Sequence, residues 1–81
     1  MFYTYILKSE QKNHHYIGST EDLRRRLREH NQGKTKSIGH LIPFRVIYYE
    51  AYETKTLARK RELELKNNSF RKRELFSRLG E

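Results

Sequence analysis

The sequence contains no cysteine, and this absence removes several kinds of chemistry at once. Without thiols the chain cannot form disulfides, use a thiolate nucleophile or hold zinc through cysteine ligands, and it suits a reducing compartment. No apolar run approaches the ~20 residues that span a bilayer. The first residues also lack the charged and apolar regions of a secretory signal. We therefore expect a cytoplasmic protein with no membrane partner.

Apolar residues are few as well, at 35% of the 81 residues. A chain of this length has room for one domain, which buries roughly 60% of the surface that the unfolded chain exposes. No internal repeat, low-complexity segment or linker divides the sequence. We expect a single domain over residues 1–81, with little room for a separate module that reads base sequence.

Acidic residues are fewer than basic ones. The sequence has 10 Asp and Glu and 18 Lys and Arg, which gives a formal charge of +8. Such a field attracts polyanions and speeds their encounter with the protein. No segment combines a basic face with a broad aromatic or leucine stripe, which argues against a membrane surface. DNA is the expected partner and RNA stays open as an alternative. A solvated basic surface without a specific partner is the plainer interpretation.

Three segments have the composition of β-strands. Residues 2–8 alternate aromatic and aliphatic side chains, and residues 14–18 form a second short run that should pair with the first as a hairpin. Residues 44–50 are rich in β-formers and predict a third strand. Residues 34–42 lack a clear period, so we expect a loop there.

Three further segments predict helices. Ser19 or Thr20 offers an N-cap for the first, which should run to about Asn31. Thr54 can cap the second and Ser69 the last. The apolar residues expected on their inner faces are Leu23, Leu27, Leu57, Ala58, Leu65, Phe70, Leu75, Phe76 and Leu79. The predicted order of elements is therefore β-β-α-β-α-α.

Five polar side chains on these elements could do chemistry together. Arg26 and His30 are four residues apart and share one helix face. Tyr5 and Tyr16 lie on neighbouring strands, and Glu62 lies beside the inner face of the second helix. Phosphodiester hydrolysis needs such a set: a hard oxygen ligand for Mg²⁺, a cation for the developing negative charge, and a group that activates water.

Each of these residues also has a plainer role when it is taken alone. A strand tyrosine commonly fills the core, and a surface arginine is usually solvated. Glu62 could be a helical ion-pair partner, and His30 near a helix end could complement the helix dipole. No single position therefore establishes a function.

The joint spacing is more specific than any single residue. Tyr3-Thr4-Tyr5, ten intervening residues and Tyr16-Ile17-Gly18 resemble the paired signature of the GIY-YIG nuclease superfamily, with Tyr3 in place of its glycine. A strand tolerates that change. The similarity continues through Gly18-Ser19-Thr20, Asp22-Leu23, Arg26-Leu27, His30-Asn31, Ala58-Arg59-Lys60-Arg61-Glu62 and Lys66. It covers nearly the whole chain, and residues 41–50 are typical of the small single-domain bacterial branch.

The resemblance implies an α+β fold with a three-stranded antiparallel sheet flanked by helices, and a metal-dependent DNA endonuclease. Glu62 would ligate one Mg²⁺ or Mn²⁺, and Arg26 would contact the scissile phosphate. We favour Tyr5 as the base and Tyr16 as the group that positions water. His30 competes as the base, because a tyrosine pKa of about 10 must first be lowered by neighbouring cations.

The remaining expectations concern the substrate. DNA contacts are expected from Arg24, Arg25, Arg28 and Lys66. Because the chain has no second domain that recognises base sequence, we expect cleavage that is selective for DNA structure or non-specific. A protein partner could supply targeting. We expect no small-molecule cofactor. The alternatives are a non-catalytic nucleic-acid-binding module on the same fold and an interaction subunit that meets an acidic protein.

Overall fold

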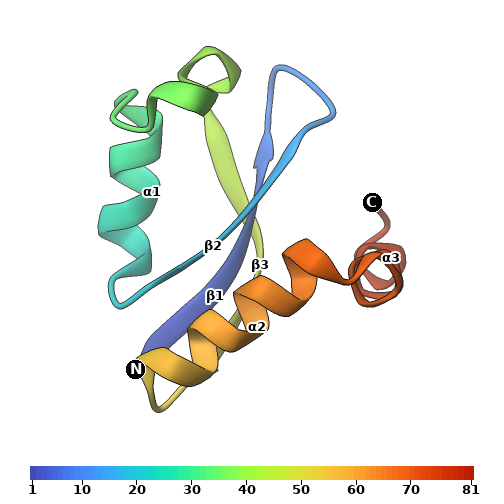
Figure 1. Ribbon diagram of the computed structural model, residues 1–81. Coiled ribbons are helices and arrows are strands. Elements are labelled where there is room, and N and C mark those ends of the chain that lie inside the picture. The colour runs from blue at the N-terminus through green and yellow to red at the C-terminus, as the bar shows by residue number, and fades with distance from the viewer.

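The computed structural model describes residues 1–81, apart from the side chain of Lys36. Its elements are β1 (Phe2–Ser9), β2 (His15–Thr20), α1 (Leu23–Asn31), the 3₁₀ helix η1 (Lys36–Leu41), β3 (Phe44–Tyr52), α2 (Lys55–Asn67) and α3 (Ser69–Arg78). The predicted order of three strands and three α-helices is confirmed (Figure 1). Among the described residues, no helix combines the length and apolarity needed to cross a bilayer.

The sheet has three antiparallel strands in the order β2-β1-β3, so β1 is central and β2 is an edge strand. Tyr5 pairs with Gly18 on one side and with Tyr49 on the other. Because side chains alternate along a strand, Tyr5 and Leu7 face one side of the sheet, whereas Thr4 and Ile6 face the opposite side.

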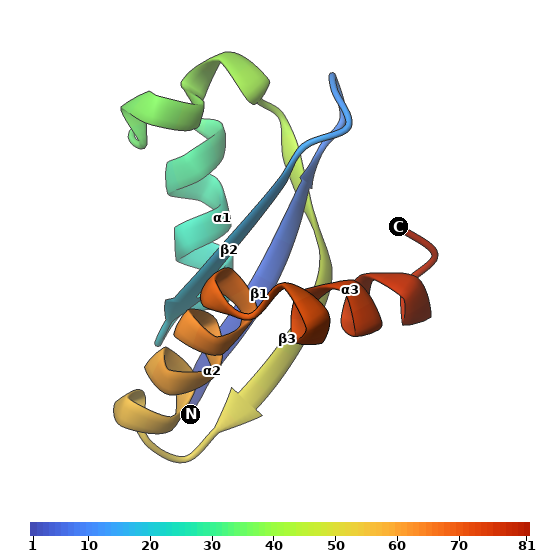
Figure 2. The ribbon, with the colours of Figure 1, turned by 45° about the vertical axis from the view of Figure 1, so that its right-hand side comes forward.

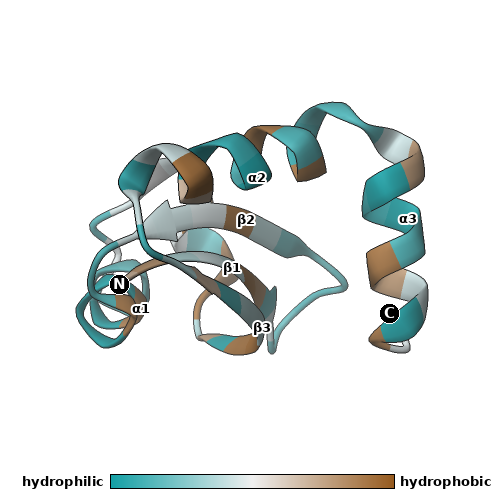
Figure 3. Cartoon of the chain, turned by 90° about the horizontal axis from the view of Figure 1, so that it is seen from below, coloured by the Kyte–Doolittle hydropathy of each residue, from teal (hydrophilic) through white to brown (hydrophobic). Residues whose placement is uncertain are grey.

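Helices cover both faces of this sheet (Figure 3). On the α1 side, Tyr5 and Leu7 pack with Ile38, Leu41 and Phe44. The opposite side is covered by α2 and α3, which Figure 2 shows in front of the strands. The second core consists of Ile6, Ile17, Leu65 and Leu75. Any site on this fold must therefore lie on one face or wrap around an edge strand.

Several local expectations were wrong. Residues 36–41 form a 3₁₀ helix rather than a loop, and this helix buries Ile38 and Leu41. Asp22, not Ser19 or Thr20, caps α1 by accepting a hydrogen bond from the backbone N–H of Arg25. Asn68 rather than Ser69 caps α3 in the same way.

Two apolar residues assigned to inner faces are exposed. Leu57 is 47% exposed and Phe70 is 65% exposed. The buried residues of α2 are Ala58, Glu62 and Leu65, which recur at intervals of four and three and so define one helix face. Leu57 lies about 100° around the helix from Ala58, so it points away from the sheet.

Candidate active site

Four of the five sequence-predicted residues meet on the α1 side of β1 and β2. The Tyr5 hydroxyl lies 3.1 Å from Nε2 of His30. The Tyr16 ring is 6.3 Å from the Tyr5 ring and 4.7 Å from the His30 ring, centroid to centroid. Arg26, one turn before His30 on α1, lies close enough to Tyr5 and Tyr16 for both phenols to contribute to its raised pKa, against the opposing effect of burial. The spacings therefore bring these side chains together as expected.

Gly18 makes this arrangement possible. A Cβ at this position would lie 2.5 Å from the Tyr5 hydroxyl, 2.7 Å from its ring carbon Cζ and 3.1 Å from Cε1 of Tyr16. The Tyr5 phenol lies directly against the backbone of β2, which no residue with a side chain permits without moving the ring. The glycine of the second motif is thus required by a close approach between neighbouring strands.

Burial controls the protonation of the Tyr5–His30 pair. Desolvation raises the pKa of Tyr5 to about 12, and the opposing effect of Arg26 is smaller. Desolvation also lowers the pKa of His30 to about 4, and the Arg26 charge adds to this shift. At neutral pH the pair is a protonated phenol and a neutral imidazole. The expected lowering of the tyrosine pKa by neighbouring cations is not found at Tyr5.

The hydrogen bonds of His30 follow from these states. Its side chain is fully buried, and Nδ1 has no hydrogen-bond partner among the described residues. When the Tyr5 phenol donates to Nε2, the imidazole must carry its proton on Nδ1. The neutral imidazole then offers Nε2 as an acceptor that can take the phenolic proton.

Glu62 reaches the site from the opposite face of the sheet. It is 4% exposed, and three donors satisfy its carboxylate. The Ser19 hydroxyl donates to Oε1 at 2.6 Å, the Lys66 ammonium to Oε2 at 2.6 Å, and the Arg59 guanidinium lies 2.8 Å from Oε2. Burial raises the pKa of Glu62, but the hydrogen bonds from these donors outweigh it and hold the pKa below its usual value.

Lys66 links the two halves of the site around the β2 edge. Its ammonium lies 5.9 Å from the centroid of the Tyr16 ring while it pairs with Glu62. The Glu62 charge also contributes to the raised pKa of Tyr5. The five predicted residues therefore form one cluster that wraps around an edge strand.

Sequence reasoning missed the role of Ser19 in this cluster and named Arg59 only as a possible ion-pair partner of Glu62. Ser19 was expected to cap α1, yet it faces α2 and holds Glu62. The alternation of β2 was the available signal, because it places Ser19 on the same face as Ile17. Arg59 lies three residues before Glu62, a spacing that brings side chains together on a helix.

The basic residues predicted to contact DNA divide into two groups. Arg24, Arg25 and Arg28 are exposed on α1, and Arg25 makes only a 3.9 Å contact with Glu21. Lys66 instead forms an ion pair with Glu62. Arg26 pairs with Glu29 at 3.2 Å, which leaves its guanidinium between that carboxylate and the phenols.

The family model of the GIY-YIG catalytic domain matches residues 1–74. The chain belongs to the GIY-YIG family. This family is a nuclease-type family whose members generally use a divalent metal and act on DNA. The resemblance inferred from the two tyrosine motifs is therefore confirmed.

Relatives and a solved structure agree with this assignment. A UPF0213 protein of Haloquadratum walsbyi is 32% identical over 79 residues, which cover 96% of this chain and 88% of that protein. A UPF0213 protein of Streptococcus pyogenes is 35% identical over 74 residues, with 90% and 79% coverage. The solution NMR structure of a UPF0213 protein from Bacillus halodurans is 36% identical, with a TM-score of 0.57 over 98% of this chain and 85% of that one.

The residues present fit a single hard metal ion of the kind that GIY-YIG nucleases use. Glu62 is a buried, ionised carboxylate and would supply one oxygen ligand. No group of three or more His, Asp or Glu able to hold a metal occurs in the described part of the chain. Mg²⁺ commonly binds through one or two carboxylates and completes its shell with water and substrate phosphate. The donor set therefore suits an ion that binds together with a nucleic acid.

Proposed function

We propose that this protein is a divalent-metal-dependent endonuclease that hydrolyses phosphodiester bonds in DNA, by DNA structure or without specificity. The observation that carries the proposal is the position of Glu62. A buried, ionised carboxylate lies at the β2 edge, where Lys66 links it to the Tyr16 ring and where its charge reaches Tyr5. A negative charge there does not help a protein to bind a polyanion, because it repels phosphate.

Glu62 would hold one Mg²⁺ or Mn²⁺, together with a phosphate oxygen and water. The ion would supply positive charge for the phosphate and for the departing 3′ oxygen, so no protein acid is needed there. Lys66 and Arg59 must then release Oε2, and the phosphate at the same edge offers both cations a new partner. Ser19 keeps Oε1 oriented.

Tyr5 and His30 would activate water as one unit. The attacking water gives its proton to the Tyr5 oxygen while the phenolic proton moves to Nε2 of His30, 3.1 Å away. This transfer avoids a free phenolate, which a pKa of about 12 makes scarce at neutral pH. The resulting hydroxide attacks phosphorus, and Tyr16 positions the water beside the His30 ring.

Arg26 would hold a non-bridging phosphate oxygen. Its partial exposure beside the phenols lets its guanidinium contact a phosphate at the entrance of the cluster. Loss of one preorganised donor of this kind typically costs about 10²–10³-fold in rate. Arg24, Arg25 and Arg28 extend the positive surface along α1, where DNA would lie.

A non-catalytic nucleic-acid-binding module on the same fold is the second candidate. The three donors on Glu62 favour it, because a purely structural carboxylate would be satisfied in the same way. The two candidates differ in one respect only. Turnover must depend on both a divalent ion and Glu62, whereas binding must depend on neither.

The test is a cleavage assay on branched, nicked, single-stranded and duplex DNA, with Mg²⁺, Mn²⁺ or EDTA. We expect metal-dependent cleavage of at least one substrate, which Glu62→Gln abolishes and Glu64→Gln preserves. Glu64 is the matched control because it lies two residues away on α2 and is exposed. DNA affinity in EDTA should be unchanged or slightly raised in Glu62→Gln. Equal cleavage by Glu62→Gln and the parent would refute the proposal.

A further inference from the structure

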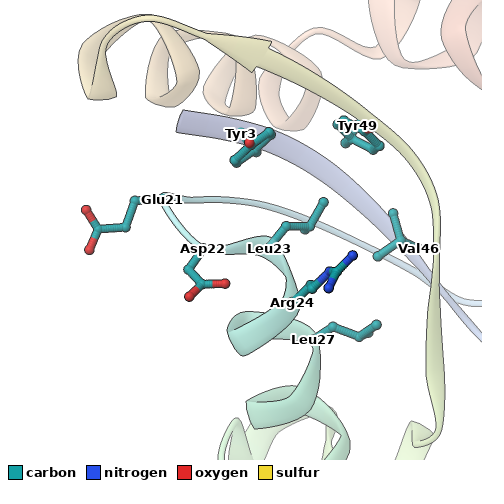
Figure 4. Close-up of a pocket in the computed structure, with 8 residues that line it drawn as sticks. All are labelled: Tyr3, Glu21, Asp22, Leu23, Arg24, Leu27, Val46 and Tyr49. Carbon is teal, nitrogen blue, oxygen red and sulfur yellow. The ribbon is translucent and has the colours of Figure 1, made fainter. Parts of the chain in front are cut away.

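A groove of about 590 Å³ opens on the α1 side of the sheet, between the start of α1 and strand β3. Leu23, Leu27 and Val46 form part of its lining, and the rings of Tyr3 and Tyr49 lie along its upper rim (Figure 4). The groove is separate from the Tyr5–His30 pair but belongs to the same face of the sheet, because Tyr49 is the cross-strand partner of Tyr5.

The two tyrosines form an aromatic platform. Their ring centroids are 5.8 Å apart at an interplanar angle of 72°. Tyr49 is 55% exposed although it is a large side chain on a strand. An exposed aromatic face beside an open groove offers a stacking surface to a flat ligand, and base–aromatic stacking contributes about 1–3 kcal/mol per base.

The charges around the groove distinguish a base from a phosphate. Glu21 and Asp22 line its outer end, where a phosphate would be repelled. Figure 4 shows Arg24 extending from α1 toward Val46 and Tyr49, whereas the Glu21 carboxylate points away from both rings. An uncharged base therefore suits the platform, and the phosphate attached to it suits Arg24.

We infer that this groove binds an unstacked nucleobase from a single-stranded segment that flanks the cleaved phosphate. The base stacks on Tyr49 with Tyr3 against its edge, and Arg24 holds the adjoining phosphate. Duplex bases stack on one another and cannot occupy the platform without being extruded. The groove thus selects single-stranded or flap DNA over intact duplex.

The path between the groove and the Tyr5–His30 pair crosses α1. Arg26 faces Tyr5 and Tyr16 on one flank of this helix, whereas Arg24 extends toward β3 on the other. A helix is about 10–12 Å wide with its side chains, a width that a few nucleotides can span. The exposed Arg25 and Arg28 lie on this helix and can accompany the phosphates across it.

This inference rests on the proposed function for the location of the cut, but its test measures binding alone. Fluorescence anisotropy in EDTA would compare a labelled 15-nucleotide single strand with its duplex for the parent, Tyr49→Ala, Tyr49→Phe and Phe70→Ala. Phe70 is the matched control because it is an exposed aromatic on α3, outside the groove. Thermal unfolding of each variant establishes that it is folded.

We expect Tyr49→Ala to weaken single-strand binding about 30-fold, the middle of the stacking range, with duplex binding unchanged. Tyr49→Phe should bind like the parent because the ring remains, and so should Phe70→Ala. Abasic sites in the single strand should remove the effect of Tyr49→Ala. The inference is overturned if Tyr49→Ala binds the single strand like the parent, if it loses both DNA forms equally, or if the parent binds neither. A protein that fails to cleave but shows the Tyr49-dependent preference would refute the proposed function and leave this inference standing.

Discussion

Lys66 lies one helical turn after Glu62 on α2, and its ammonium is 2.6 Å from the carboxylate oxygen Oε2. Glu62 is buried while the Lys66 side chain is 40% exposed, so the lysine is the member of the pair that can move. Lys66 therefore occupies the position that a divalent cation on Oε2 would take under the proposed function, and such an ion would displace it.

The first prediction concerns this competition. Lys66→Met should raise the affinity for Mn²⁺ about three- to tenfold, because one competing charge is gone and a partly solvent-exposed pair contributes only about 1 kcal/mol. Paramagnetic broadening of the Ser19 and Glu62 amide signals during an Mn²⁺ titration measures it without reference to cleavage. Lys60→Met, at an exposed position of the same helix, is the control. Equal affinities in the two variants would show that Lys66 does not compete with the ion.

The second prediction tests the proton path. Tyr5→Phe should lower the rate constant of cleavage about 10²–10⁴-fold, the usual contribution of general acid–base catalysis, and should leave DNA affinity in EDTA unchanged. Tyr52→Phe is the control, because its hydroxyl donates to Glu50 at the end of β3, away from the cluster. The measurement is single-turnover cleavage at saturating protein. A Tyr5→Phe variant that cuts at the parental rate would exclude Tyr5 from the proton path.

The third prediction concerns Gly18. Gly18→Ala should lower the free energy of unfolding by about 1–3 kcal/mol, the usual cost of overpacking, because the new methyl group meets the Tyr5 ring. Urea denaturation measures the loss, and near-ultraviolet circular dichroism reports the displaced tyrosine. Gly39→Ala is the matched control, since an added Cβ there meets nothing within 4 Å. Similar stability in the two alanine variants would mean that β2 moves away from the Tyr5 ring at no cost and that Gly18 is not required.

The fourth prediction follows from the low pKa of His30. An unfolded histidine has a pKa of about 6.5, whereas burial and the Arg26 charge hold that of His30 at about 4. The unfolded chain therefore binds more protons between these values, and stability must fall as the pH falls through this window. The free energy of unfolding should fall by about 2 kcal/mol from pH 7.5 to pH 5, at about 1.4 kcal/mol per pKa unit.

Urea denaturation at several pH values checks this fourth prediction. His30→Gln removes the titrating group, so its stability should change little over the same range, whereas His14→Gln at an exposed turn position should retain the parental slope. Glu62, whose pKa is lowered, loses its stabilising contribution only as the pH falls below the usual carboxyl pKa, so it does not obscure the window. A parental slope that persists in His30→Gln would assign the pH dependence to other groups.

The local pattern of apolar and polar residues was enough to predict most of the helices and strands. The alternation from Phe2 onward predicted β1 to within a residue of its observed end at Ser9, and the β-formers after Pro43 predicted β3. The 3₁₀ helix at residues 36–41 escaped prediction, because a segment so short shows no usable period. It is fixed instead by the burial of Ile38 and Leu41 against the sheet.

The choice of helix cap illustrates the limit of local reasoning. Ser19, Thr20 and Asp22 all offer an oxygen near the start of α1, and intrinsic preferences do not separate them. The structure separates them because Ser19 donates to Glu62, 43 residues later in the chain. The choice of capping residue therefore depends on a contact between residues that are far apart in the sequence.

The sequence by itself named five side chains of the candidate site, and the spacing of its two tyrosine motifs identified the family. Only the tertiary structure decided their chemical states. Tyr5 and His30 are 25 residues apart, and their shared burial sets both pKa values in directions that neither residue implies alone. Desolvation and hydrogen bonding act through space between chain-distant groups, so protonation and access to a metal are properties of the folded protein.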